Sequence, residues 1–495
     1  MPRSYLDLPV PIAAAATAPG EAALALVRAS GPGALELAAS CFSRPAALLA
    51  APGHSLVHGR LVHPATGEAA DEVLASVFRA PRSFTGEDAV EFSCHGSPAA
   101  LRRVLEALEA AGFSPALPGE FAFRAFANGK SDLVRAEAID ELIRSRSEGA
   151  REGALLRLEG GLSRRLEAAR AALLDVLAEV EIRLDYAEED GAPAEAPNPG
   201  AIAALRDSLA ALAATYRAGR LYRDGVRVAL AGRANAGKSS LFNLLLREER
   251  SIVSPEAGTT RDWIEAGLEL AGFPVRLLDT AGLREASGAV EAEGVARSRR
   301  LLAEAELVVY VVDGAAGLLT AEDEAFLADR PEAIRAWNKI DAAGAAAAPA
   351  GFVALSAATG EGFPALLAAL EASLRALARG EAKGASAPGR GAPGGGAPGC
   401  EAQEGGVSGP AGVPARGAPA EAELRVASER QKVLLDRAVA ALDAALAKGG
   451  APFDSRLDAF ALDLREAADA LGEITGEISA PEILEAIFSR FCLGK

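Results

Sequence analysis

The sequence predicts a multidomain α/β protein: an N-terminal α+β domain, then an α-helical domain, and within the helical domain an inserted α/β domain with a mostly parallel sheet. Three patterns support this prediction. Residues 1–127 alternate short β-like runs with turns, and apolar residues recur at helical spacing in both 128–222 and 423–495. Residues 223–378 alternate strand-like and helix-like segments, an order typical of a parallel sheet. Because helical segments flank 223–378 on both sides, we expect it to be an insertion.

In the N-terminal domain, the β-like runs end at turn-forming residues. One run, 23–28, is followed by Ser30-Gly-Pro-Gly33, and another, 72–78, is followed by Pro81. An amphipathic helix is predicted over 99–111 and stops at Gly112.

The first helical segment carries a nearly continuous apolar stripe, which we interpret as the core of a helical bundle rather than a ligand site. Gly160-Gly161 is expected to bend or interrupt it. The stripe consists of Leu158, Leu162, Leu166, Leu173, Leu177, Val180 and Leu184.

Residues 379–422 are rich in Gly, Ala and Pro and are predicted to be a flexible linker, because they offer too little apolar surface to pack. Cys400 lies in this segment and is expected to be exposed.

Composition limits the classes of function. The 495 residues carry a formal net charge of −17, so affinity for nucleic acid is not a property of the whole surface, and an RNA substrate needs a local basic region or a partner. The four cysteines, Cys41, Cys94, Cys400 and Cys492, form no CxxC pair, which argues against a zinc site or a disulfide framework. With no signal-peptide pattern and no apolar run of membrane-spanning length, a cytoplasmic protein is expected.

Residues 232–240 read GRANAGKSS and match the phosphate-binding loop pattern G-x-x-x-x-G-K-[ST]. The glycines allow a tight turn whose N–H groups face phosphate oxygens, Lys238 supplies a point charge, and Ser239 offers a hydroxyl to Mg²⁺. The strand-like run 226–231 precedes the loop and a helical leucine pattern follows it. This is the context that such a loop requires.

A second motif, Asn338-Lys-Ile-Asp341, predicts specificity for guanine. A carboxylate at Asp341 can accept hydrogen bonds from the guanine N1–H and exocyclic amine, which adenine lacks, so such a site can discriminate by roughly 10⁴-fold. Lys339 places its aliphatic stem over the base, and a backbone N–H of Ser356-Ala357 is expected to face the guanine O6.

Two further stretches complete a Ras-like P-loop GTPase domain. Asp279-Thr-Ala-Gly282 ends a predicted strand, where the carboxylate can hold Mg²⁺ through water and the Gly282 N–H can bind the γ-phosphate. In Gly258-Thr-Thr-Arg-Asp262, Thr260 can add a second hydroxyl to Mg²⁺ in a loop ordered by the γ-phosphate. Along the chain the four motifs follow the order typical of GTPases, which predicts GTP binding and hydrolysis and disfavours an ATP-dependent kinase.

Leu283 stands where a Ras-type enzyme carries a water-orienting glutamine. Glu285, Glu291 and Glu293 are the candidates to replace it. The alternative is that they form a solvated acidic helix face.

The ends of the chain carry a family resemblance. The C-terminus reads Phe488-Ser-Arg-Phe-Cys-Leu-Gly-Lys495. The N-terminal half contains Phe84-Thr-Gly-Glu-Asp88, Pro118-Gly-Glu-Phe121, Arg124-Ala-Phe126 and Ala136-Glu-Ala-Ile-Asp140. Together with the nucleotide motifs, these stretches resemble the MnmE (TrmE) family of tRNA modification GTPases over nearly the whole chain except the linker.

The resemblance implies a homodimer whose N-terminal domain binds a tetrahydrofolate derivative, 5-formyl- or 5,10-methylene-tetrahydrofolate. With the flavoprotein MnmG, which holds FAD and is expected to make much of the tRNA contact, family members form a heterotetramer. They add an aminomethyl or carboxymethylaminomethyl group to C5 of the wobble uridine of certain tRNAs. The alternative is a regulatory GTPase switch in ribosome assembly, whose flanking domains serve only dimerisation.

The resemblance also implies site residues outside the nucleotide motifs. The folate positions fall on Arg28, Glu91, Lys130 and Lys495. Cations suit the glutamyl carboxylates of a folate and a carboxylate suits the pterin N–H donors. Cys492 matches the family's C-terminal cysteine, for which a role in the modification chemistry and a packed small hydrophobe are both open.

For the GTPase domain, the resemblance implies activation by K⁺ and by dimerisation across the nucleotide, and it selects Glu291 as the water-orienting residue. The K⁺ positions are Asn235, Ser254, Glu256 and Thr259, and the Mg²⁺ positions are Ser239 and Thr260. Two departures from the family, Ala234 for proline and Ser254 for threonine, are expected to be tolerated. The complete candidate GTP-binding set is Asn235, Ala236, Gly237, Lys238, Ser239, Ser240, Ser254, Pro255, Glu256, Ala257, Gly258, Thr259, Thr260, Asp279, Thr280, Ala281, Gly282, Asn338, Lys339, Asp341, Ser356 and Ala357.

Overall fold

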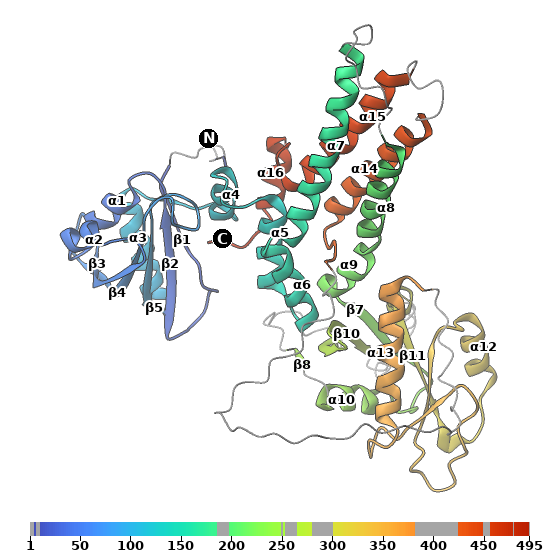
Figure 1. Ribbon diagram of the computed structural model, residues 1–495. Coiled ribbons are helices and arrows are strands. Elements are labelled where there is room, and N and C mark those ends of the chain that lie inside the picture. Colours follow the sequence, from blue (N-terminus) through green and yellow to red (C-terminus); the bar gives the residue numbers. More distant parts are fainter. Residues whose placement is uncertain are drawn as a thin grey trace, which may run out of the picture. The chain divides into compact units, whose positions relative to one another are not determined.

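The chain divides into two compact units. The first contains Met1–Arg144, Ala154–Ala210 and Val433–Lys495, and the second contains Ser145–Gly153 and Ala211–Lys432. Both segments of the second unit therefore lie, in the sequence, between segments of the first (Figure 1), as expected from the helical segments on both sides. The exact domain boundaries stay predictions. The computed structural model describes residues 4–5, 10–185, 198–248, 251–252, 265–279, 300–381, 424–448, 456–478 and 480–494.

The first unit begins with a six-stranded sheet and three helices. In sequence order these are β1 Ile12–Ala15, β2 Leu24–Ser30, α1 Ala34–Ser40, α2 Pro45–Ala50, β3 Ser55–Val62, β4 Ala69–Phe78, β5 Ala89–His95, α3 Pro98–Ala111 and β6 Ser114–Pro115. The strand order is β3-β4-β5-β2-β1-β6, and neighbours are antiparallel except for the parallel pair β1 and β6. Alternation along β3 buries Val57 and Leu61 and exposes Leu56 and His58, so one face of the sheet packs against α1 and α3.

A smaller core joins the chain's C-terminal part to a helix of the N-terminal half. Helix α4 (Glu120–Ala127) packs against α16 (Pro481–Phe488), and the rings of Phe123 and Phe488 lie 5.4 Å apart in an edge-to-face arrangement. Gly119 makes this approach possible, because a Cβ there would lie 2.5 Å from the carbonyl oxygen of Phe488. Two segments that are distant in sequence thus share one apolar cluster.

The remaining helices of the bundle are α5 Leu133–Arg144, α6 Glu148–Leu158, α7 Gly161–Asp185, α8 Pro199–Ala214, α14 Glu429–Lys448 and α15 Leu457–Thr475. Helix α7 packs along α15 (Figure 1) and buries Leu162, Leu166, Leu173, Leu177 and Val180, as the apolar stripe predicted. The predicted interruption is also present. Helix α6 ends at Leu158, and Gly160 takes a φ of 83° where a Cβ would lie 2.1 Å from the Arg135 guanidinium.

The second unit contains a seven-stranded sheet of order β13-β12-β11-β7-β10-β9-β8. Its elements are α9 Tyr216–Asp224, β7 Val226–Ala231, α10 Lys238–Glu248, β8 Ser251–Ile252, β9 Glu265–Leu270, β10 Phe273–Asp279, β11 Leu307–Asp313, the 3₁₀ turn η2 Gly314–Ala316, α12 Ala321–Asp329, β12 Ile334–Asn338, β13 Val353–Ala354 and α13 Phe363–Arg379. Five neighbouring strands, from β13 to β10, are parallel, and β9 and β8 add two antiparallel pairings. The predicted mostly parallel sheet is therefore confirmed.

The central strands of this sheet are buried on both faces. Along β7, Val228 and Leu230 join the cluster that includes α10 and α13, while Ala229 and Ala231 join the cluster that includes α12. Because the carboxyl ends of parallel strands meet at one edge, the last residues of β7, β10 and β12 gather there. This edge carries the phosphate-binding loop, Asp279 and Asn338.

Residues 382–423, which hold most of the predicted linker together with Cys400, lie outside the described residues. Among the helices that the structure describes, none combines the length and apolar character that a membrane crossing needs.

Candidate functional site

The loop between β7 and α10 adopts backbone conformations that glycine favours. Gly232, Asn235 and Gly237 have φ values of 136°, 62° and 96°. A Cβ on Gly232 would lie 2.1 Å from the Val311 carbonyl oxygen, and one on Gly237 would lie 2.1 Å from Asn338 Nδ2. Both glycines are thus required by close packing as well as by their dihedral angles, as a phosphate-binding loop demands.

Lys238 is the first residue of α10, and its side chain folds back over the loop. Its Nζ donates hydrogen bonds to the carbonyl oxygens of Gly232 at 2.9 Å and Arg233 at 2.8 Å, and the residue is buried. The positive charge therefore lies at the N-terminal end of the helix, whose dipole also favours an anion.

Ser239 and Asp279 come together although 40 residues separate them. The parallel register pairs Asp279 with Leu230, so β10 ends beside the start of α10. There the Ser239 hydroxyl donates to Asp279 Oδ2 at 2.9 Å. A hydroxyl and a carboxylate oxygen are ligand types that suit Mg²⁺, so this pair fits the role predicted for it.

Asn338 links two loops at the carboxyl edge of the sheet. It ends β12, is fully buried, and donates from Nδ2 to the carbonyl oxygen of Ala236 at 2.8 Å. Its Oδ1 accepts from the N–H of Ala357 at 2.9 Å. The phosphate-binding loop and the 356–357 loop are thus held in a fixed relation by one amide side chain.

The other residues of the predicted guanine pocket surround Asn338. Lys339 has a φ of 65°, and its Nζ forms an ion pair with Asp313 Oδ2 at 2.7 Å. Asp341 is exposed, and no described residue pairs with it, so its carboxylate is available to a ligand. The N–H groups of Ser356 and Ala357 both bond within the protein, the first to Glu361 O at 2.8 Å. Their expected contact with guanine O6 stays a prediction.

Several candidate residues fall outside the described part of the chain. They are Ser254, Pro255, Glu256, Ala257, Gly258, Thr259, Thr260, Thr280, Ala281, Gly282, Glu285, Glu291, Glu293 and Lys495. Of the predicted Mg²⁺ and K⁺ positions, the structure therefore describes Ser239 and Asn235. Ser240, in the first turn of α10, is exposed.

The predicted folate residues begin with a cross-strand ion pair. Arg28 on β2 and Glu91 on β5 are register partners, and Arg28 Nε donates to Glu91 Oε1 at 2.7 Å. The guanidinium carbon lies 5.1 Å from the ring centre of Phe84 and 5.7 Å from that of Phe121, which are cation–π distances. Arg28 Nη1 also lies 3.5 Å from the carbonyl oxygen of Gly494, the residue before Lys495.

Lys130 lies against the loop that contains Phe84. Its Nζ donates to the Pro81 carbonyl oxygen at 3.1 Å, its stem lies beside Gly86, and no described carboxylate pairs with it. Gly494 packs so closely on β1 that a Cβ would lie 2.2 Å from the Ala15 carbonyl oxygen. The structure thus places the C-terminal residues against the strand next to Arg28.

The cysteines differ in exposure. Cys41 and Cys94 lie in the core of the N-terminal sheet, and burial raises the pKa of the Cys41 thiol to about 11 and also raises that of Cys94. Neither is a thiolate at neutral pH. Cys492 is exposed in this chain, so it is not packed as a small hydrophobe here, while a chemical role stays a prediction.

Sequence reasoning missed part of both sites. Asp313, the partner of Lys339, ends the apolar run of β11 just before Gly314, a position at the carboxyl edge of a parallel sheet that could have identified it. Phe84 and Phe121 lie in the stretches that carry the family resemblance, but no role was assigned to them. Their spacing in the sequence offers no sign that both rings approach Arg28.

Comparisons with known proteins cover nearly the whole chain. Residues 133–492 match the family model described as the MnmE helical domain, and residues 11–130 match the model described as the GTP-binding protein TrmE N-terminus. A protein of Treponema denticola named tRNA modification GTPase MnmE is 39% identical over 490 residues, which are 98% of each chain. One of the same name from Thermus thermophilus is 41% identical over 99% of this chain and 100% of its own. Among solved structures, the FeoB G-domain of Methanococcus jannaschii is 25% identical and covers 30% of this chain and 98% of its own, with a TM-score of 0.24.

Proposed function

The chain belongs to the MnmE family of tRNA modification GTPases, and we propose that it uses GTP hydrolysis to drive modification of the tRNA wobble uridine. It is a GTP-hydrolysing enzyme of tRNA modification. The finer proposal is that it works with an MnmG-type flavoprotein. The pair adds an aminomethyl or carboxymethylaminomethyl group to C5 of the uridine and takes the one-carbon unit from a tetrahydrofolate derivative.

The observation that carries the nucleotide part is the pair of hydrogen bonds made by Asn338. This side chain ties the phosphate-binding loop at Ala236 to the loop at Ala357, while the carboxylate of Asp341 stays exposed. A nucleotide whose phosphates bind at the N-terminus of α10 can then meet Asp341 with the guanine N1–H and exocyclic amine. These donors identify GTP rather than ATP.

The residues at the phosphate end have separable roles. Lys238 brings positive charge to the β- and γ-phosphates, and Ser239 with Asp279 would hold Mg²⁺, with Thr260 as a second hydroxyl. When bound, Mg²⁺ neutralises charge on the phosphate oxygens. Asn235 lies in the loop in a left-handed conformation and is the described member of the proposed K⁺ set, whose other members are Ser254, Glu256 and Thr259. Glu291 is proposed to orient the attacking water.

The proposal of a folate site is supported by the charges of the side chains around Arg28. Arg28 and Glu91 already neutralise each other, so Glu91 can accept from pterin N–H donors while Arg28 stays compensated. Lys130 has no described acidic partner and is exposed, which makes it the available cation for a glutamyl carboxylate. Lys495 is proposed as the second cation, because Gly494 before it contacts Arg28.

The proposed assembly is a homodimer in the cytoplasm that binds an MnmG-type partner as a heterotetramer. The partner supplies FAD and much of the tRNA contact. This division suits a chain with a net charge of −17, whose overall field repels phosphates.

The test of this function is mass spectrometry of wobble nucleosides in tRNA from a strain that lacks the gene. We expect the C5-modified uridines to disappear, to return with the wild-type gene, and to stay absent with Lys238→Ala. Unchanged wobble nucleosides in the deletion strain would reject the proposal. A purified protein that hydrolyses GTP yet gives no change in fluorescence or melting with 5-formyltetrahydrofolate would instead favour a regulatory GTPase without folate chemistry.

A further inference from the structure

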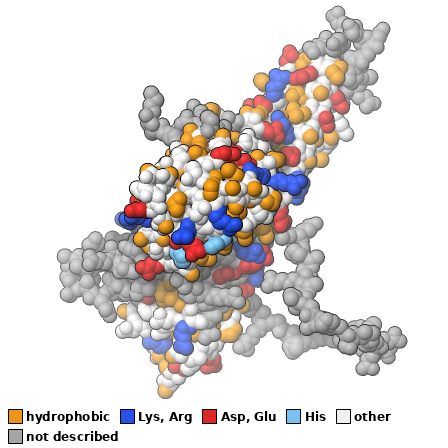
Figure 2. Space-filling model, turned by 90° about the vertical axis from the view of Figure 1, so that its left-hand side faces the viewer, with side chains coloured by type: hydrophobic (Ala, Val, Ile, Leu, Met, Phe, Trp, Pro, Cys, Tyr) orange, Lys and Arg blue, Asp and Glu red, His pale blue; other side chains and the backbone are white. Residues whose placement is uncertain are grey.

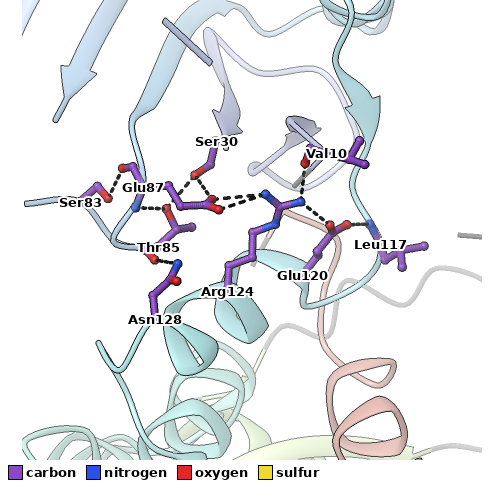
Figure 3. A network of polar contacts seen from close by, with 9 residues as sticks. All are labelled: Val10, Ser30, Ser83, Thr85, Glu87, Leu117, Glu120, Arg124 and Asn128. Atoms are coloured by element: carbon purple, nitrogen blue, oxygen red, sulfur yellow. Dashed lines mark hydrogen bonds and ion pairs between the residues drawn. The ribbon is translucent and has the colours of Figure 1, made fainter. Parts of the chain in front are cut away.

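Three stretches that carry the family resemblance meet at one buried arginine (Figure 3). Arg124 on α4 has a fully buried side chain. Its Nη1 lies 3.3 Å from both carboxylate oxygens of Glu87, and its Nη2 donates to Glu120 Oε1 at 2.8 Å and to the Val10 carbonyl oxygen at 2.6 Å. The motif at 84–88, which is distant in sequence from the other two, and the motifs at 118–121 and 124–126 are therefore parts of one polar network.

The loop that contains Glu87 is fixed at further points. Ser30 donates from Oγ to Glu87 Oε2 at 2.9 Å and shares a hydrogen bond with the Thr85 hydroxyl at 2.7 Å. Ser83 donates to the Glu87 carbonyl oxygen, and Asn128 Nδ2 donates to the Thr85 carbonyl oxygen at 2.8 Å. Figure 3 shows these groups closing around the loop from β2 on one side and α4 on the other. The backbone from Ser83 to Glu87 thus has little freedom.

The Glu120 carboxylate is fixed by hydrogen bonds to both of its oxygens. Besides the bond from Arg124, its second carboxylate oxygen accepts from the N–H of Leu117 at 2.7 Å, which fixes the start of α4. Glu120 is buried and lies one turn of helix before Arg124. The position of the next residue, Phe121, follows from that anchor.

A buried arginine with two carboxylates is a poor device for stability alone. The cost of desolvating such ions offsets much of their attraction, and apolar residues of similar volume often stabilise a core as well. What the network does supply is fixed geometry, since the planar guanidinium accepts partners only in set directions. The question is therefore which functional groups this geometry positions.

The groups that it positions surround Arg28. Phe84 lies between Ser83 and Thr85, and Phe121 follows Glu120 directly. These two rings are the ones that approach the Arg28 guanidinium, at 5.1 Å and 5.7 Å. Ser30, a further member of the network, lies two residues after Arg28 on the same strand. Through Glu87 and Glu120, Arg124 is thus linked to the segments that carry both aromatic neighbours of Arg28, and through Glu87 and Ser30 it is linked to the strand that carries Arg28.

We propose that Arg124 is a positioning residue for the candidate folate site, where it sets the places of Phe84 and Phe121 and through them the orientation of Arg28. This proposal rests on the proposed folate function. Arg124 has no exposed surface with which to touch a ligand, so its effect on binding is indirect.

The experiment titrates 5-formyltetrahydrofolate into the full-length protein and its Arg124→Lys variant. Lysine keeps the charge but cannot bridge Glu87, Glu120 and Val10 at once, so we expect folate affinity to fall about tenfold or more. The matched control is Arg157→Lys, which alters another buried arginine, paired with Glu141 in the helical bundle, and should leave folate affinity unchanged. Thermal unfolding identifies any variant that fails to fold.

Two readouts separate positioning from a general loss of stability. In a double-mutant cycle, Phe84→Ala and Arg124→Lys should weaken folate binding less than additively. The reason is that Phe84→Ala already removes one of the two rings through which Arg124 acts. In protein with ¹⁵N-labelled arginine, the Arg28 Nε–H signal, assigned with Arg28→Lys, should shift in Arg124→Lys but not in Arg157→Lys. If Arg124→Lys misfolds, Glu87→Gln takes its place in the same measurements.

Wild-type folate affinity in Arg124→Lys, or strictly additive effects with Phe84→Ala, would overturn the proposal. If the wild-type protein itself binds no folate, the folate assignment fails. The NMR readout then decides the positioning alone: an unmoved Arg28 signal in Arg124→Lys refutes it.

Discussion

Asn338 Nδ2 donates a hydrogen bond to the carbonyl oxygen of Ala236 at 2.8 Å, although 102 positions separate the two residues. The same amide accepts from Ala357, so one buried side chain sets the distance between the phosphate-binding loop and the far end of the proposed guanine pocket. A nucleotide that spans the two ends must match this distance. The geometry leads to the following predictions.

Replacing Asp341 by asparagine should change the preferred base. An amide in place of the carboxylate both accepts and donates, so it cannot accept from the guanine N1–H and the exocyclic amine at once, and GTP affinity should fall about 10²-fold or more. Xanthosine triphosphate carries a carbonyl in place of that exocyclic amine and should bind better. Nucleotide affinities measured by fluorescence titration check this. Because Asp341 is exposed, the melting temperature of the variant should match that of the wild-type protein, and retained preference for GTP would contradict the assignment.

Gly237→Ala should abolish tight nucleotide binding. The new Cβ would lie 2.1 Å from Asn338 Nδ2, so the loop or the amide must move, in addition to about 1 kcal/mol of strain from the φ of 96°. The control is Gly360→Ala in the same unit. It carries the same kind of strain at a φ of 82° but has no atom within 4 Å of the added Cβ, and it should bind GTP normally. If both variants lost GTP affinity to the same extent, the backbone strain and not the contact with Asn338 would be the cause.

Glu291→Ala should lower kcat for GTP hydrolysis strongly, by about 10²-fold, with GTP affinity near normal, since an orienting group acts on the attacking water and not on the bound nucleotide. Turnover under saturating GTP and a separate binding titration provide the two numbers. Glu285→Ala and Glu293→Ala are the comparison variants. A larger loss in either of them would transfer the role.

Replacing KCl by NaCl at equal ionic strength should slow GTP hydrolysis, because the proposed Asn235 site supplies positive charge to the transition state through a bound K⁺. In Asn235→Ala, which removes the ligand, the rates in the two salts should become equal. If the wild-type protein already hydrolyses GTP equally fast in both salts, Asn235 has no role in K⁺ activation.

The pair His95 and Asp71 on the N-terminal sheet should give a small pH dependence of stability. The side-chain hydrogen bond with Asp71 at 2.8 Å raises the pKa of His95. Burial acts to raise the pKa of Asp71, but the hydrogen bonds from His95 outweigh burial, and the pKa of Asp71 is lowered. The histidine contributes stability below its unfolded pKa of about 6.5 and loses it as pH rises through the higher folded value. The carboxylate contributes above its unfolded pKa and loses its share as pH falls through the lower folded value.

An NMR titration of the histidines checks this directly. In Asp71→Asn the midpoint of the His95 signal should fall, and the difference in melting temperature from the wild-type protein should be larger near pH 5.5 than near pH 8.5. The histidine is largely exposed, and Figure 2 shows histidine side chains next to acidic and basic ones on the surface, so solvent keeps the effect small. An unmoved midpoint would mean that the ion pair does not form in solution.

Within single segments, local pattern was enough. The strand before the phosphate-binding loop, the helix after it, the apolar stripe of α7 and the break at Gly160 were all predicted, because each depends on the spacing of apolar residues and glycines along a few turns of chain. The fold class followed from the order of such segments. A motif such as Asn338-Lys-Ile-Asp341 likewise carries its chemistry in adjacent residues.

By itself, then, the sequence determined the elements around the phosphate-binding loop, the apolar stripe of α7, the mostly parallel sheet and the family to which the chain belongs. Only the tertiary structure decided which distant groups meet: Asn338 with Ala236, Arg28 with the two rings, and Arg124 with Glu87. The physical reason is that spacing along a helix or strand is set by backbone geometry, whereas a contact between segments depends on how whole layers pack and in which register strands pair.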